Sequence, residues 1–128
     1  MNKLFFTGNK SIDNELIALF GGHIIKADNI DNADIIIEST NFPQEKKHSA
    51  IKELDEKCSR PVPVLTSSLC VSVSEQCSLS KYPERLIGIG AYNTISTAKI
   101  IEIAPSKITN TDILEKTKQL FQETGINY

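Results

Sequence analysis

The chain has 128 residues, 40% of them hydrophobic, and a formal net charge of −2. Such a length allows one domain with a single core, spanning residues 1–128. The nearly balanced charge, without a dense basic stretch, argues against nucleic acid as a partner. No apolar run approaches the roughly 20 residues that cross a membrane, and the short apolar start is typical of a first strand rather than a signal peptide.

The three cysteines are Cys58, Cys70 and Cys77, and no two of them have CxxC spacing. An odd number in this arrangement argues against a disulfide framework and against a zinc site. We therefore expect free thiols, no bound metal and a cytoplasmic location, where thiols stay reduced.

Short apolar runs alternate with amphipathic stretches of helix length, which predicts an α/β domain with a mostly parallel sheet. In the first half, we expect strands at residues 4–6, 23–28 and 35–37. A helix should lie between the first two strands, with Ser11 as its N-cap and Gly21-Gly22 as its stop. Because residues 35–37 are consecutively apolar, the third strand should be covered on both faces.

The same alternation continues through the second half of the chain. Pro43 is expected to open a helix, and Ser72 with Glu75 fits a capping box for a shorter one. Pro63, inside the apolar run 62–65, indicates an edge strand, a bulge or a late strand start. Further strands are expected at residues 86–89 and 99–103, followed by a helix that begins near Asn110 or Thr111 and ends at Gly125.

Four motifs follow one another between residues 64 and 103: Thr66-Ser67-Ser68-Leu69, Pro83-Glu84-Arg85-Leu86-Ile87-Gly88, Ala91-Tyr92-Asn93 and Lys99-Ile100-Ile101-Glu102-Ile103. Their order resembles the 3-hydroxyacyl-CoA dehydrogenase family, in which a TSSL turn, a PERxIG segment, an HFFNP-type turn and a KLVEV-type strand succeed one another. The resemblance implies a single Rossmann-like domain of three layers. Because Asp28 runs almost directly into the strand at 35–37, we expect a shortened first half, and the family's helical C-terminal domain is not expected.

The resemblance also implies catalytic positions. The family's carboxylate falls on Glu102 and its turn asparagine on Asn93, but the position of its catalytic histidine holds Gly90. The family's serine falls on Ser67 if the TSSL motif is matched, and on Leu69 if residues are counted without gaps from the flanking segments. A histidine is the usual base for removing a hydroxyl proton near neutral pH, so its loss predicts a lack of dehydrogenase activity.

The nucleotide site shows similar damage. A dinucleotide fold holds pyrophosphate on a GxGxxG turn, whereas this chain reads Gly8-Asn9-Lys10-Ser11-Ile12-Asp13, so Lys10 and Asp13 replace two of the glycines. Asp28 stands where an acid could bond a ribose hydroxyl, or else is a solvated turn residue. Lys47 matches a family lysine near the cofactor, although a lone lysine on a helix is usually solvated. The resemblance thus implies NAD as cofactor, while the broken turn predicts that tight NAD binding is lost.

Three functions follow from these observations. We expect foremost a dehydrogenase-like module without dehydrogenase activity, which binds a nucleotide, an acyl-CoA derivative or a partner protein. The alternative is an active NAD-dependent 3-hydroxyacyl-CoA oxidoreductase whose catalytic residues are rearranged or supplied by a partner. The shortened first half would leave surface for a second copy to cover, which predicts a homodimer.

Overall fold

The computed structural model describes residues 1–91 and 99–128. Its strands are β1 (Asn2–Thr7), β2 (Ile24–Lys26), β3 (Ile35–Glu38), β4 (Val64–Ser67), β5 (Leu86–Gly90) and β6 (Glu102–Pro105). Its helices are α1 (Lys10–Phe20), α2 (Gln44–Lys57), α3 (Val73–Leu79) and α5 (Thr111–Thr124). Short 3-10 turns lie at η1 (Gly21–His23), η2 (Ile30–Asn32) and η3 (Pro83–Arg85).

The strands of the described residues form one sheet in the order β2-β1-β3-β4-β5-β6. Strands β1 to β5 pair in parallel, and β6 pairs antiparallel with β5. The expected mostly parallel sheet is therefore confirmed. All four residues of β3 are buried, as the prediction of a strand covered on both faces requires.

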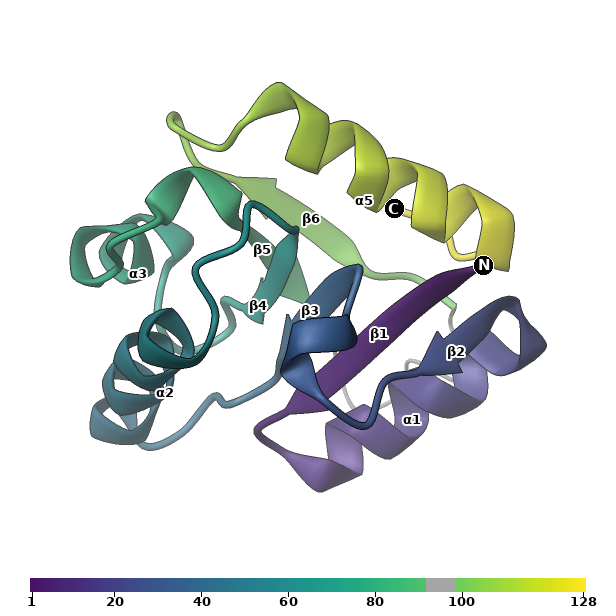
Figure 1. The fold of residues 1–128 in the computed structure, drawn as a ribbon, viewed down its shortest axis with the longest axis horizontal. Coiled ribbons are helices and arrows are strands. Elements are labelled where there is room, and N and C mark those ends of the chain that lie inside the picture. The colour runs from purple at the N-terminus through teal and green to yellow at the C-terminus, as the bar shows by residue number, and fades with distance from the viewer. Residues whose placement is uncertain (92–98) are drawn as a thin grey trace.

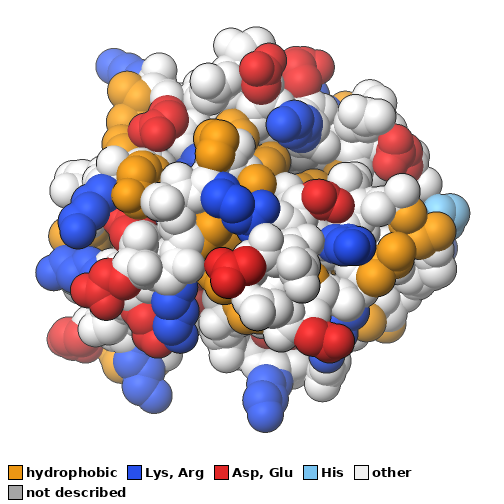
Figure 2. Space-filling view, viewed as in Figure 1, with side chains coloured by type: hydrophobic (Ala, Val, Ile, Leu, Met, Phe, Trp, Pro, Cys, Tyr) orange, Lys and Arg blue, Asp and Glu red, His pale blue; other side chains and the backbone are white. Residues whose placement is uncertain are grey.

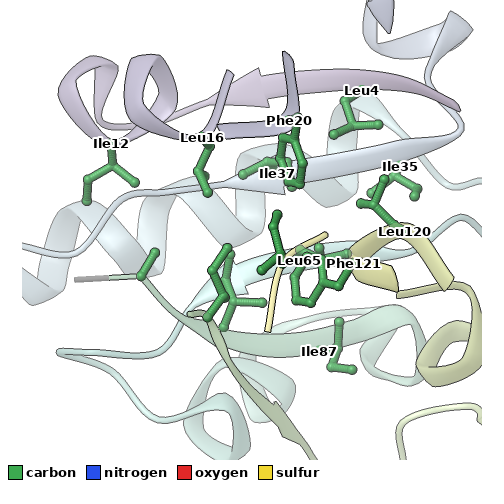
Figure 3. Close-up of a cluster of buried hydrophobic side chains, with 14 of the residues drawn as sticks. Leu4, Ile12, Leu16, Phe20, Ile35, Ile37, Leu65, Ile87, Leu120 and Phe121 are labelled. Carbon is green, nitrogen blue, oxygen red and sulfur yellow. The ribbon is translucent and has the colours of Figure 1, made fainter. Parts of the chain in front are cut away.

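Helices cover both faces of this sheet and make three layers (Figure 1). Helices α1 and α5 pack on one face through Leu16, Phe20 and Phe121 against strand residues such as Leu65 and Ile87 (Figure 3). Helices α2 and α3 pack on the other face in a second buried cluster that includes Leu54 and Cys77. The Rossmann-like three-layer architecture that the sequence indicated is thus confirmed.

The sheet lacks one unit of the full dinucleotide fold. That fold has the strand order 3-2-1-4-5-6, and the five parallel strands here follow it with the outermost strand missing, while β6 is added antiparallel at the opposite edge. The connection from β2 to β3 contains only the single turn η2. Strand β2 therefore forms an edge of the sheet, and the predicted shortening of the first half is confirmed.

A buried polar network fastens this short connection. The Arg60 guanidinium donates through Nη2 to the carbonyl oxygens of Ile30 at 2.7 Å and of Ala33 at 3.0 Å. Arg85, which is 1% exposed, donates to the carbonyl of Arg60 at 2.9 Å and to Asp55 Oδ1 at 3.2 Å. Arg85, in the PERxIG segment, therefore supports the scaffold. It bonds the backbone of Arg60, and the side chain of Arg60 bonds η2.

Several expected boundaries shift. The last strand begins at Glu102 rather than Lys99, and His23 lies in η1 rather than at the start of β2. Pro63 immediately precedes β4, which agrees with the predicted alternative of a late strand start. Its carbonyl accepts a hydrogen bond from the Ile36 amide at 2.9 Å. The proline thus joins the sheet through its carbonyl, the one backbone hydrogen-bonding group it has.

The first and last helices end where the sequence predicted. Gly21 is the C-cap of α1, and Gly125 is the C-cap of α5 in the left-handed conformation, with φ of 72°. Asn110 caps the N-terminus of α5 by accepting a hydrogen bond from the Asp112 amide at 2.8 Å. On the molecular face shown in Figure 2, acidic and basic side chains are intermixed, in keeping with the balanced net charge.

Candidate functional site at the switch point of the sheet

Strands β1 and β3 are neighbours, but the chain leaves β1 toward one edge of the sheet and β3 toward the other. Ligands of open α/β sheets bind at such a switch point, beyond the carboxyl ends of the strands. Here those ends bring Gly8 together with Glu38, Ser39 and Thr40. These residues define the switch-point site.

Gly8 forms the tight turn that follows β1. Its φ is 118°, a region that residues with side chains rarely adopt. A Cβ placed on Gly8 would lie 2.6 Å from the amide nitrogen of Thr40 and 2.9 Å from Glu38 Oε2. The one glycine of the expected phosphate turn is therefore required by close contact with this chain's own residues.

Glu38 and Lys47 form a buried ion pair at this turn. The Lys47 ammonium, whose side chain is 0% exposed, donates to Glu38 Oε1 at 2.8 Å, and Glu38 is 1% exposed. Burial lowers the pKa of Lys47, and the negative charge of Glu38 opposes that shift. The interpretation of Lys47 as a solvated helix residue is wrong, because the side chain points under the end of β3 instead of into solvent.

The start of α1 is capped by side chains of the chain itself. Asn9 Oδ1 accepts from the amides of Ser11 at 3.0 Å and Ile12 at 3.2 Å, so the N-cap is Asn9. The prediction that Ser11 is the N-cap is wrong, because Ser11 already lies inside the helix. The Asn9 amide in turn donates to Ser39 Oγ at 2.8 Å, which ties α1 to the end of β3.

Asp13 closes the same corner from the first turn of α1. It is 7% exposed, and its Oδ1 accepts a hydrogen bond from Ser39 Oγ at 2.7 Å. Burial raises the pKa of the Asp13 carboxyl, the bond from Ser39 opposes this, and the charge of Glu38 adds to it. Asp13, which replaces the last glycine of the turn, therefore places a second carboxylate beside the first.

A cavity of about 530 Å³ opens next to this corner, between β1, η2 and α2. Phe5, Ile30 and Leu54 contribute apolar lining, and Gly8 and Glu38 lie at the end that meets the switch point. Asp28 follows β2, is exposed and precedes Ile30 by two residues. The cavity lies where the connection from β2 to β3 is short, so the missing unit leaves a hollow over β1.

The positions that the resemblance assigns to catalysis lie at the same carboxyl edge of the sheet, on the neighbouring strands β5 and β6. Gly90 of β5 pairs directly with Glu102 of β6. A Cβ on Gly90 would lie 3.3 Å from Glu102 Oε2 and 3.6 Å from Leu69 Cδ2. The carboxylate thus stands beside the position of the missing histidine, although Glu102 itself is exposed. The predicted turn asparagine, Asn93, lies outside the described residues.

The two registers for the serine differ in their surroundings. Ser67 is buried at 3% exposure, and its hydroxyl donates to the Asn41 side-chain oxygen. Leu69, from the alternative register, is the residue whose side chain reaches the Gly90 position. The structure brings Glu102, Gly90 and Leu69 together, whereas the hydroxyl of Ser67 is engaged with the segment after β3.

Two further ionisable side chains, His48 and Glu75, bond each other on the surface of the protein. His48 lies on the surface of α2, with Nε2 2.9 Å from Glu75 Oε2. The hydrogen bond with His48 lowers the pKa of Glu75. Ser72 caps α3 by accepting from the Glu75 amide at 3.1 Å, but the Glu75 carboxylate reaches α2 instead of closing the capping box.

Within residues 1–91 and 99–128, no cluster of three or more histidine, cysteine or acidic side chains is arranged to hold a metal ion. No helix in that part of the chain combines the length and apolarity needed to cross a membrane.

The sequence interpretation missed Glu38, Ser39 and Thr40. Their only sequence signal was their place directly after the buried apolar run 35–37, which is where a parallel strand presents residues to a switch point. The contacts of Glu38 with Gly8 and Lys47 join residues far apart in the chain.

The strand order, the switch point and the glycine turn together define a Rossmann-type dinucleotide-fold domain. The family model described as "3-hydroxyacyl-CoA dehydrogenase, NAD binding domain" matches residues 14–127. The chain belongs to this family.

Individual relatives agree with the family. The chain is 27% identical over 97 residues to a 3-hydroxybutyryl-CoA dehydrogenase of Clostridioides difficile, covering 73% of this chain and 34% of that protein. It is 26% identical over 119 residues to an L-carnitine dehydrogenase of Staphylococcus epidermidis, covering 93% of this chain and 36% of the relative. The chain therefore spans about a third of the length of these relatives.

Solved structures share the fold. A (S)-3-hydroxybutyryl-CoA dehydrogenase of Ralstonia eutropha superposes with a TM-score of 0.84 at 13% identity, over 99% of this chain and 62% of that one. A 3-hydroxyacyl-CoA dehydrogenase of Archaeoglobus fulgidus gives 0.81 at 14% identity, over 98% and 54%. At these identities the likeness shows the fold alone.

Proposed function

We propose that this chain is a 3-hydroxyacyl-CoA dehydrogenase-family domain without dehydrogenase activity, which acts as a binding or interaction module. Its ligand would be a nucleotide, an acyl-CoA derivative or a partner protein, in a cytoplasmic setting. Gly90 carries this proposal, because it stands beside Glu102 where the family resemblance places the histidine base. Loss of a general base typically lowers a rate by about 100- to 10,000-fold.

The assay uses acetoacetyl-CoA and NADH, followed by the absorbance of NADH. The expected result is no turnover above the background without protein. Turnover at ordinary enzyme rates, on the order of 1 per second or faster, would refute the proposal.

The second candidate is an active oxidoreductase whose catalytic residues are rearranged or supplied by a partner. The retained carboxylate favours it, because Glu102 Oε2 lies 3.3 Å from the Cβ position of Gly90. If turnover is found, the Glu102→Gln variant should abolish it under this candidate. Glu115→Gln on α5 makes the same chemical change at an exposed helix position and is the matched control.

We further propose a homodimer in which a second copy covers the β2 edge. Strand β2 has three residues and pairs on one side with β1, at the end of the sheet order. Ile25 in this strand is 46% exposed. An edge strand presents unpaired backbone groups and can pair with another chain, and an exposed isoleucine adds apolar area to such a contact.

A further inference from the structure

The hollow over β1 is a groove that follows one side of α2. Among the α2 residues that line it are Lys46, Ala50, Glu53 and Lys57. These four recur at intervals of three and four residues, which places them in one row on the helix. At 1.5 Å per residue the row rises by about 16 Å, or roughly three turns. The groove is therefore long enough to lie beside a second helix.

The floor of this groove is apolar. Phe5 of β1, Ile30 of η2 and Ala50 of α2 line it, and each is only partly buried. Phe5 and Ile30 border the buried cluster on this face of the sheet without being enclosed by it. In a doubly wound domain, helices cover the apolar faces of the sheet. The groove thus has the place and the floor that a further helix would cover.

Charged side chains stand along the α2 wall in an order that a partner can match. Lys46, Glu53 and Lys57 are exposed, and their charges along the row are positive, negative and positive. Glu53 and Lys57 form an ion pair at 2.7 Å on the surface, where such pairs are weak and can exchange partners. Glu45 also lines the groove but lies off the row, about 100° around the helix from Lys46. A helix beside this wall would complement the row with an acid, a base and an acid.

We infer that this groove is the docking site for an amphipathic helix of a partner protein. The partner helix places an apolar stripe on the floor and an acid, a base and an acid beside Lys46, Glu53 and Lys57. An amphipathic helix laid in an apolar groove is a recurring mode of protein recognition. The inference rests on the proposed function and deepens it, because it states what kind of partner the interaction module binds and where.

The test uses the full chain and fluorescently labelled synthetic peptides of alanine with one stripe of leucines. One peptide carries glutamate, lysine and glutamate in the spacing of the α2 wall, and a second carries the reversed charges. Both are made in either chain direction and are longer than about 15 residues, so that they form helix in solution. Fluorescence anisotropy should show that the first peptide binds about tenfold more tightly than the reversed one.

Exchanging charges on the protein should exchange this preference. Glu53→Lys combined with Lys57→Glu keeps the net charge and the ion pair, and should make the reversed peptide the tighter ligand. Glu115→Lys combined with Lys118→Glu exchanges another ion pair, at 3.9 Å on α5, and should leave the preference as in the wild type. This second exchange is the matched control.

A third variant tests the floor of the groove. Ala50→Arg puts a long charged side chain among the apolar residues and should abolish binding of the first peptide. Its thermal unfolding shows whether the chain is folded, and the charge exchange decides the matter if it is not.

Equal binding of the two peptides, or no binding at protein concentrations up to roughly 1 mM, would overturn the inference. So would displacement of the bound peptide by NAD⁺, which would assign the groove to a nucleotide. The turnover assay with acetoacetyl-CoA is independent of these measurements. Failed peptide binding without turnover would leave the proposed lack of dehydrogenase activity standing, whereas turnover would refute that proposal whatever the peptides do.

Discussion

At the scale of one residue, Asp13 helps to hold the switch-point site together, although burying its carboxylate costs free energy of folding. Its carboxyl is buried and accepts a single strong hydrogen bond from Ser39, with the negative Glu38 close by. A buried carboxylate with incomplete compensation prefers its protonated form, which is why the pKa of Asp13 is raised. The residue closes the corner but opposes folding once it is ionised.

The sign of this effect gives a pH prediction. Because the pKa of Asp13 is higher in the folded state than its ordinary value of 3.8, the folded state binds its proton more tightly than the unfolded state. The stability that this provides is present below the ordinary value and is lost as pH rises through the raised pKa. Asp13→Asn cannot ionise and keeps an acceptor for Ser39. Its stability relative to wild type should therefore be greater at about pH 7 than at about pH 3.5.

The measurement is urea unfolding of both proteins at the two pH values. Asp112→Asn is the matched control, since Asp112 also lies in the first turn of a helix but is exposed. A relative stability of Asp13→Asn that is lower at about pH 7 than at about pH 3.5 would contradict the prediction.

At the scale of the element, α1 begins with a cap that the sequence pattern placed two residues too late. Asn9 and Ser11 are both good N-cap residues, so composition alone does not distinguish them. The tertiary structure decides for Asn9, because its amide is held by Ser39 while its side chain accepts from two helix amides. The cap is therefore part of the bond network that joins α1 to the end of β3.

This choice predicts different costs for two substitutions. Asn9→Ala removes the acceptor of the Ser11 and Ile12 amides and should lower the free energy of unfolding by about 1 kcal/mol. Ser11→Ala, inside the first turn, should change it by only a few tenths of a kcal/mol. Thermal or urea unfolding of both variants measures the difference. A larger loss in Ser11→Ala would restore the boundary expected from the sequence.

At the scale of the whole molecule, the missing strand determines which surfaces are open. It leaves β2 as an edge and a cavity over β1 between η2 and α2. The first feature supports association through the sheet edge, and the second lies beside the switch-point site. One shortening of the chain thus accounts for both the proposed dimer edge and the hollow over β1.

The proposed dimer predicts a state that light scattering can measure. The wild type should have twice the mass of the chain at micromolar concentration, and Ile25→Lys should shift it to the monomer, because a charge on the edge strand opposes pairing with a second edge. Ile108→Lys makes the same change at a residue that is 53% exposed in the turn before α5, and should leave the dimer intact. A wild-type monomer, or equal effects of the two substitutions, would contradict the proposal.

The sequence by itself determined the class of fold, the family and the loss of the histidine. These properties depend on local patterns: apolar runs of strand length, the glycine stops of α1 and α5, and motifs in a fixed order that place Gly90 before Glu102. Each can be read within a window of a few residues or from a fixed spacing. The shortening before residues 35–37 was likewise visible as too few residues for another helix and strand.

Only the tertiary structure decided how the switch-point site is arranged. In sequence, Glu38 ends an apolar run, Lys47 is one of several lysines, and Gly8 is the remnant of a phosphate turn. Folding brings the end of β3 against the turn after β1, and burial then makes each charge require a partner. The carboxylate of Glu38 meets that requirement with Thr40 and Lys47, and in doing so it takes the place beside Gly8.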